Sequence, residues 1–296
     1  MLKEGGERQL GLVWGQNDLE AHLLKLASIR QEYVRPSRQD FEESLRTKDP
    51  KYGKGAREYI SWLHGFPERI IPEIALPETI LLGDDWLKGI KAITSRTDED
   101  GKERYWYFVA DPKNLSVNLV HKDSWVGNSK SITLRDYLAF LRQTELDENK
   151  VVVGFGHTHP GRKHNRRTWK HYNRPESAAY FSPVDLGNIL TWNFLPFHVV
   201  ANGSKASLVF LTRDSRLSSQ ADLIEEFVRD SRTYVPKGWG EPKTFIQLLR
   251  DVSFLSVFVV IKPKKDFDMF DWNRRMAQRY GLALYQGRLE ELTRVG

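Results

Sequence analysis

Two histidines, His157 and His159, stand two positions apart at the end of an apolar run, residues 151–155. Such a run is typical of a buried strand, in which alternate residues point to the same side. Both imidazoles can therefore reach one metal ion. Further along the chain, the segment SPVD at residues 182–185 opens a predicted helix and supplies the carboxylate of Asp185. Two histidines and one carboxylate form a catalytic zinc ligand set, in which a fourth position is left for a water whose pKa the metal lowers to about 7.

The SPVD segment also has an ordinary structural explanation. Ser182 suits the N-cap of a helix, Pro183 its first position and Asp185 its third, so this segment alone predicts a helix start. A His-x-His pair alone likewise does not define a ligand set. The ordered combination of the two motifs favours a metal site, and one residue can cap a helix and still face a metal. Because the chain contains no cysteine, histidine and carboxylate must hold any metal.

The order of these motifs resembles the JAMM signature of the JAB/MPN metalloprotease family: an upstream glutamate, then His-x-His, then Ser-x-x-Asp. The resemblance covers about residues 81–212. It implies an α/β fold with a JAMM-like central mixed β-sheet flanked by helices. It also implies a zinc ion (Zn2+) bound by His157, His159 and Asp185, with Ser182 supporting the reacting carbonyl or water.

The glutamate that the resemblance requires as general base is Glu103 in our interpretation. Glu103 directly precedes the aromatic segment RYWYFVA, where the family's first core strand should begin, and it lies 54 residues before His157. Glu99, in the preceding turn, and Glu78 are alternatives. A solvent-exposed carboxylate at the start of a strand would give the same pattern.

The segment between His159 and Ser182 is the main departure from the family pattern. Its 22 residues exceed the family's separation, and six basic residues against one acidic residue give it a net charge of +5. Cations interleaved with aromatic rings suit a nucleic-acid strand, and they equally suit an acidic protein surface. A solvated loop at the rim of the site is the simplest explanation. The residues proposed for substrate or nucleic-acid contact are Arg162, Lys163, Arg166, Arg167, Trp169, Lys170 and Arg174.

The remaining sequence predicts three segments. Leucines at helical spacing predict a helix over residues 17–34, with further helices near 38–46 and 56–64, and three prolines within 66–84 suit a linker. Residues 1–80 are therefore a helical N-terminal extension, residues 81–213 the JAB/MPN-like domain, and residues 214–296 an α+β C-terminal extension.

Within the two later segments, residue types predict the individual elements. Strands are expected at 104–110, 115–120, 151–155, 197–201, 206–211 and 257–261. Helices are expected at 131–143, 183–192, 219–231 and 267–280. The dipeptide Asn202-Gly203 is a favoured pair for the turn between the strands at 197–201 and 206–211.

The composition is that of an ordinary soluble protein. Of 296 residues, 40% are hydrophobic and 28% charged, and the net charge of +6 permits an acidic partner without requiring one. There is no glycine-rich phosphate loop, and the longest nearly apolar run, residues 254–261, is far shorter than the ~20 residues of a membrane span. We therefore expect a cytoplasmic protein that does not enter a membrane.

The sequence thus predicts a zinc-dependent metalloprotease or isopeptidase whose partner is a protein or peptide, with a ubiquitin-like conjugate as one candidate substrate. The alternatives are a nucleic-acid-associated module on the same fold, as in the RadC-like relatives, which would use the basic 160–181 loop, and an inactive scaffold. The oligomeric state is left open.

Overall fold

The computed structural model describes residues 12–34, 75–123, 125–127, 140, 144, 150–159, 179–191, 195–215, 226 and 268–296. In this part of the chain the helices are α1 (Gln16–Val34), α5 (Asp84–Asp100), α7 (Pro183–Thr191) and α10 (Met269–Arg279). The strands are β1 (Val13–Trp14), β2 (Thr79–Leu81), β3 (Glu103–Asp111), β4 (Ser116–Val120), β5 (Val126–Gly127), β6 (Val151–Thr158), β7 (Phe197–Asn202), β8 (Lys205–Leu211), β9 (Leu282–Arg288) and β10 (Glu291–Arg294). None of these helices combines the length and the hydropathy that a membrane span requires.

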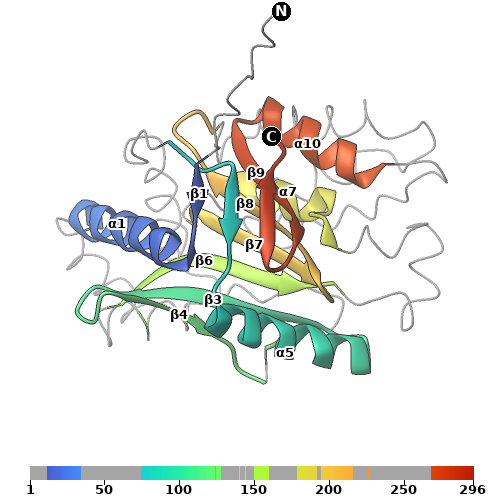
Figure 1. Ribbon diagram of the computed structural model, residues 1–296, viewed down its shortest axis with the longest axis horizontal. Coiled ribbons are helices and arrows are strands. Elements are labelled where there is room, and N and C mark those ends of the chain that lie inside the picture. The colour runs from blue at the N-terminus through green and yellow to red at the C-terminus, as the bar shows by residue number, and fades with distance from the viewer. Residues whose placement is uncertain are drawn as a thin grey trace, which may run out of the picture.

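Nine of the described strands form one mixed sheet (Figure 1). Their order is β1-β2-β10-β9-β8-β7-β6-β3-β4, and the short β5 pairs with the start of β3. Neighbouring strands are antiparallel except for the parallel pairs β1–β2 and β6–β7. The predicted α/β class with a central mixed sheet is confirmed.

Strands from all three predicted segments share this sheet. β2, which crosses the boundary expected at residue 80, pairs with β10 near the C-terminus. β9 pairs with β8 along its whole length, across the boundary expected at residue 213. The sheet therefore joins β1 and β2, the central strands and the C-terminal hairpin into one hydrogen-bonded unit.

Helices cover both faces of the sheet. α1 and α5 pack on one face, where Leu23 and Trp86 join a hydrophobic cluster with strand residues such as Leu208. α7 and α10 pack on the other face, where Trp272 joins a second cluster with strand residues such as Val209. Leu208 and Val209 are neighbours on β8 and fall in opposite clusters, as the alternation of a strand requires. We call these the α1/α5 face and the α7/α10 face.

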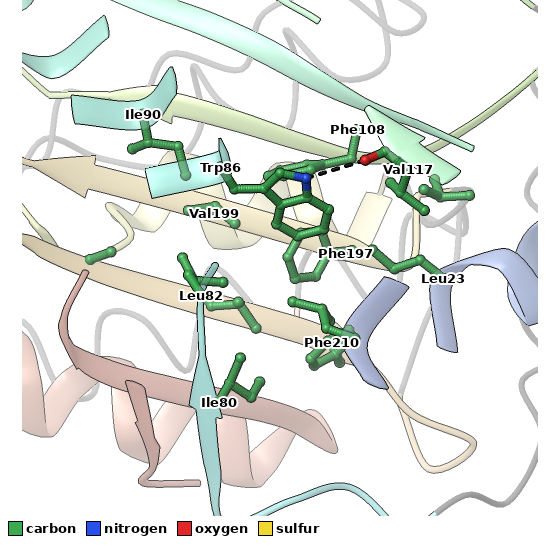
Figure 2. Packing of buried hydrophobic residues seen from close by; sticks show 14 of the residues in the cluster. Leu23, Ile80, Leu82, Trp86, Ile90, Phe108, Val117, Phe197, Val199 and Phe210 are labelled. Atoms are coloured by element: carbon green, nitrogen blue, oxygen red, sulfur yellow. Dashed lines mark hydrogen bonds between the residues drawn. The ribbon is translucent and has the colours of Figure 1, made fainter. Parts of the chain in front are cut away.

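Aromatic packing fixes α5 against the strands on either side of β6 (Figure 2). The ring of Trp86 lies 4.8 Å from that of Phe108 on β3 and 6.4 Å from that of Phe197 on β7, between centroids. Its indole N–H donates a hydrogen bond of 3.2 Å to the carbonyl oxygen of Val117 on β4. This bond satisfies a buried donor that would otherwise cost about 1–3 kcal/mol. α5 thus ties β3, β4 and β7 together around β6.

Most of the predicted elements that fall in the described residues are confirmed. The expected strands at 104–110, 115–120, 151–155, 197–201 and 206–211 correspond to β3, β4, β6, β7 and β8. The expected helices at 17–34, 183–192 and 267–280 correspond to α1, α7 and α10. The elements expected at 38–46, 56–64 and 257–261 lie outside the described residues, and those expected at 131–143 and 219–231 lie outside them except for the helical residues Phe140 and Glu226.

Several features of the structure were not predicted. The sequence analysis missed α5, and it placed Glu99 in a turn although this residue lies in the last turn of that helix. It also missed the C-terminal hairpin of β9 and β10. The proline-rich segment expected as a linker ends in a short strand, β2, because residues 79–81 add to the edge of β10.

Candidate metal centre

β6 presents both histidines on the α7/α10 face. His157 pairs in register with Val200 on β7, and Val200 belongs to the cluster under α7 and α10. His159 is the first residue beyond β6, yet its backbone N–H still donates to the carbonyl oxygen of Ala201 at 3.2 Å. This bond continues the strand pairing by one residue. The two imidazoles therefore share one side of the sheet, as the sequence predicts.

The glycines of the GFGHTHP motif face the opposite way. A Cβ atom at Gly156 would lie 2.1 Å from the ring of Trp106, and one at Gly154 would lie 2.6 Å from the ring of Phe197. Aromatic rings therefore occupy the space that side chains at these positions would need. The glycines of this motif are therefore required by close packing on the α1/α5 face, and the histidines that follow them point to the α7/α10 face.

We expect Gly156→Ala to lower the free energy of unfolding by about 1–3 kcal/mol, the usual cost of overpacking a core, because the new methyl group must displace Trp106. Gly89→Ala on α5 is the matched control. Its Cβ would meet only Leu119 at an ordinary 3.5 Å, and alanine favours a helix over glycine by about 1 kcal/mol. Urea unfolding measures both variants, and wild-type stability of Gly156→Ala would contradict this account of the packing.

The imidazoles of His157 and His159 converge with the carboxylate of Asp185 on α7. The two Nε2 atoms lie 3.1 Å apart. Asp185 places Oδ1 at 3.3 Å from Nε2 of His157 and Oδ2 at 3.4 Å from Nε2 of His159. Ligand atoms about 2.0–2.2 Å from a tetrahedral ion are about 3.4 Å from one another, so these separations fit the ligand shell of one small ion. Among the described residues, these three form a group able to hold a metal.

Reciprocal hydrogen bonds hold Asp185 at the N-terminus of α7. The backbone N–H of Ser182 donates to Oδ2 of Asp185 at 2.7 Å, and the N–H of Asp185 donates to Oγ of Ser182 at 3.2 Å. This arrangement is a capping box. The helix-cap explanation and the metal explanation of the SPVD segment are therefore compatible in a single geometry, in which the cap aims the carboxylate.

The electrostatics of the centre favour an ionised Asp185. Burial raises the pKa of this carboxyl, but the imidazoles of His157 and His159 outweigh it and hold the pKa well below its usual range. The three side chains are only 13–16% exposed. Nδ1 of His157 is buried and makes no hydrogen bond to the described residues, so the polar contacts of this ring lie on its Nε2 side. A positive ion bound by these three side chains would offset the cost of burying the Asp185 carboxylate.

No protein-family model matches the chain, and a search of curated proteins gives no match. The likeness to the JAB/MPN family therefore rests on the motif residues and their spacing, and it stays a prediction. The chemistry of the centre follows from its own geometry.

Thr158, between the two histidines, anchors β6 from the opposite face. Its Oγ1 lies 2.7 Å from Oγ1 of Thr97 on α5 and accepts a 2.9 Å hydrogen bond from the backbone N–H of Arg104 on β3. Both threonines are almost completely buried. The Arg104 guanidinium in turn binds both carboxylate oxygens of Asp100 at 2.8 Å. The ends of α5, β3 and β6 are thus held together directly behind the centre.

The sequence analysis missed this anchor. Only strand alternation could have indicated it. The residue between two histidines on the same side must point to the opposite face, into the core, where a buried hydroxyl needs a hydrogen-bond partner. The partners, Thr97 and the backbone of Arg104, come from elements 61 and 54 residues away.

Glu103, the predicted general base, is the first residue of β3. Tyr105 pairs in register with His157, so alternation along β3 puts Glu103, two residues earlier, on the same face of the sheet as His157. It is half-buried and does not belong to the three-residue ligand group. Glu103 is therefore on the face that a base acting on a bound water would need, without being one of the ligands.

The two alternative glutamates lie elsewhere. Glu99 is on α5, which packs on the opposite face of the sheet from the histidines. Glu78 immediately precedes β2, which is five strands from β6 in the sheet order. The register therefore favours Glu103 over both.

A half-buried aromatic ring lies beside His157. Phe155 stacks on the His157 ring with centroids 5.7 Å apart. His198 lies further along this face, and burial lowers its pKa to about 3. The neutral His198 ring donates from Nε2 to the carbonyl oxygen of Leu195 at 2.8 Å. It is therefore a structural histidine that is already committed to a hydrogen bond.

The basic segment between His159 and Ser182 contains the residues predicted to contact substrate or nucleic acid. All seven fall outside the described residues: Arg162, Lys163, Arg166, Arg167, Trp169, Lys170 and Arg174. Their assignment to substrate or nucleic-acid contact stays a prediction.

Proposed function

We propose that the protein is a zinc-dependent hydrolase of peptide or isopeptide bonds with a JAB/MPN-like catalytic region. The observation that carries the proposal is the convergence of two Nε2 atoms and one carboxylate at separations of 3.1–3.4 Å. These donors are the nitrogen and oxygen ligands that zinc takes in hydrolases with two histidines and one carboxylate. When bound, zinc would supply a Lewis acid for a carbonyl oxygen and lower the pKa of a water.

The chain's own residues then have separate tasks. His157, His159 and Asp185 bind the ion, and the capping box with Ser182 orients the aspartate. Ser182 accepts a hydrogen bond from the Asp185 N–H, which leaves its hydroxyl proton for the carbonyl oxygen of the substrate. The carboxylate of Glu103 accepts a proton from the water that attacks the carbonyl carbon, and it then passes this proton to the leaving amine.

The direct test is hydrolysis by the zinc-loaded protein of ubiquitin-like conjugates and of a peptide library, followed by mass spectrometry. We expect cleavage that a chelator abolishes and added zinc restores. Cleavage that persists after the metal has been removed would contradict a metal-dependent mechanism, and a fully loaded protein that cleaves neither substrate class would contradict the proposed function.

A second candidate function is nucleic-acid association through the 160–181 segment. The observation in its favour is the net charge of +5 with interleaved aromatic residues. Such binding would weaken steeply with salt and would depend on the arginines of the segment, whereas amide hydrolysis would depend on the three ligands. An inactive scaffold would show neither dependence.

A further inference from the structure

Both backbone polar groups of His159 are held by the end of β7. Its N–H donates to the carbonyl oxygen of Ala201 at 3.2 Å. Its own carbonyl oxygen accepts a hydrogen bond of 2.6 Å from Nδ2 of the next residue, Asn202. The second bond comes from a side chain because His159 lies one residue beyond β6, where the backbone ladder has ended.

The hairpin does not account for Asn202. The sequence analysis assigned Asn202-Gly203 to the turn, but Asn202 is the last residue of β7 and pairs with Lys205. The two residues between them are Gly203, with φ +57°, and Ser204. Glycine is the residue that needs the positive φ of this turn. The asparagine amide is therefore free for another task, and it is directed at the backbone of a candidate metal ligand.

We propose that Asn202 is a positioning residue of the metal centre. Its amide fixes the peptide plane that follows His159, and with it the direction of the imidazole toward Asp185, 3.4 Å away. Ligands must be held within about 0.5 Å of their working geometry, and just past the end of β6 it is the Asn202 side chain that donates to the carbonyl oxygen of His159. The inference rests on the metal centre of the proposed function and concerns how tightly that centre binds.

The test compares metal affinity in Asn202→Ala and Asn202→Leu with that of the wild type. Both variants remove the amide donor without changing the charge near the ion, and leucine keeps most of the volume. The matched control is Asn118→Ala, an exposed asparagine on β4 whose amide bonds Ser116. Zinc affinity is measured on metal-free protein by competition with a chromophoric chelator, and the ligand geometry by the visible absorption of the Co2+ form.

We expect both Asn202 variants to bind zinc about 10-fold more weakly, as loss of a supporting partner usually does, with an altered Co2+ spectrum and control-like unfolding of the metal-free protein. Affinity and spectrum equal to wild type in either folded variant would overturn the role of Asn202 alone. A wild-type protein that binds no metal would overturn the centre and the proposed function together. Weaker hydrolysis with unchanged metal binding would also count against positioning.

Discussion

Replacing His159 by alanine is expected to reduce the bound zinc from about one ion per chain, the content of a single site with these ligands, to nearly none. The variant loses one of three protein ligands and leaves Asp185 and His157 unable to close the shell. We expect the affinity to fall by more than about 100-fold, the upper end of the loss caused by removing only a supporting partner. Elemental analysis of protein purified in parallel measures the metal content.

The control for this variant is His22→Gln. His22 is a histidine on α1, buried against Trp14 and Phe210 on the α1/α5 face, whereas His157 and His159 lie on the α7/α10 face. It should retain the wild-type metal content, which shows that loss of a histidine alone does not strip the ion. If His159→Ala folds and still carries stoichiometric zinc, the ion is held elsewhere and the assignment of the centre is wrong.

The positions of His157, His159 and Asp185 could be predicted because their determinants are local. Alternation along β6 places His157 and His159 on one side whatever packs around the strand. The cap preferences of Ser182 and Asp185 act within a single helical turn, and the hydrogen bonds between these two residues are the expected ones. The convergence of the strand with the helix follows from neither pattern alone, and it was inferred from the combination of the two motifs and from their resemblance to a known motif order.

The supporting residues could not be predicted because their partners are distant in sequence. The Thr158 hydroxyl finds Thr97 on α5, a helix that the sequence analysis missed although Trp86, Ile90 and Ile93 are buried at helical spacing. The dipeptide Asn202-Gly203 was assigned to a turn because Asn-Gly favours turns. That preference gives no indication that the Asn202 side chain donates to the carbonyl oxygen of His159, beyond the end of the neighbouring strand.

The C-terminal hairpin was missed for a different reason. β9 is buried on both faces of the sheet, since Leu284 packs under α7 and α10 and Tyr285 packs on the α1/α5 face. A strand of this kind shows no alternation of polar and apolar residues, and its short apolar run does not distinguish a strand from a helix. Its pairing with β8 and β10 defines it.

Glu103→Gln is expected to abolish turnover while leaving zinc bound. Glutamine keeps the size of the side chain but cannot accept a proton at pH 7, so the loss should be that of a general base, about 100- to 10,000-fold in kcat. The position of Glu103 on the face of His157, outside the ligand group, predicts this separation of binding from catalysis. The measurement pairs single-turnover hydrolysis with elemental analysis on the same preparation.

Glu99→Gln on α5 is the matched control, because it removes a neighbouring carboxylate on the opposite face of the sheet. It should keep both the metal and the activity. Full activity in Glu103→Gln would refute the assignment of the base, and loss of zinc in that variant would make Glu103 a ligand. If Glu99→Gln instead were the inactive variant, the proton would reach the centre from the α5 side, and the argument from strand register would fail with it.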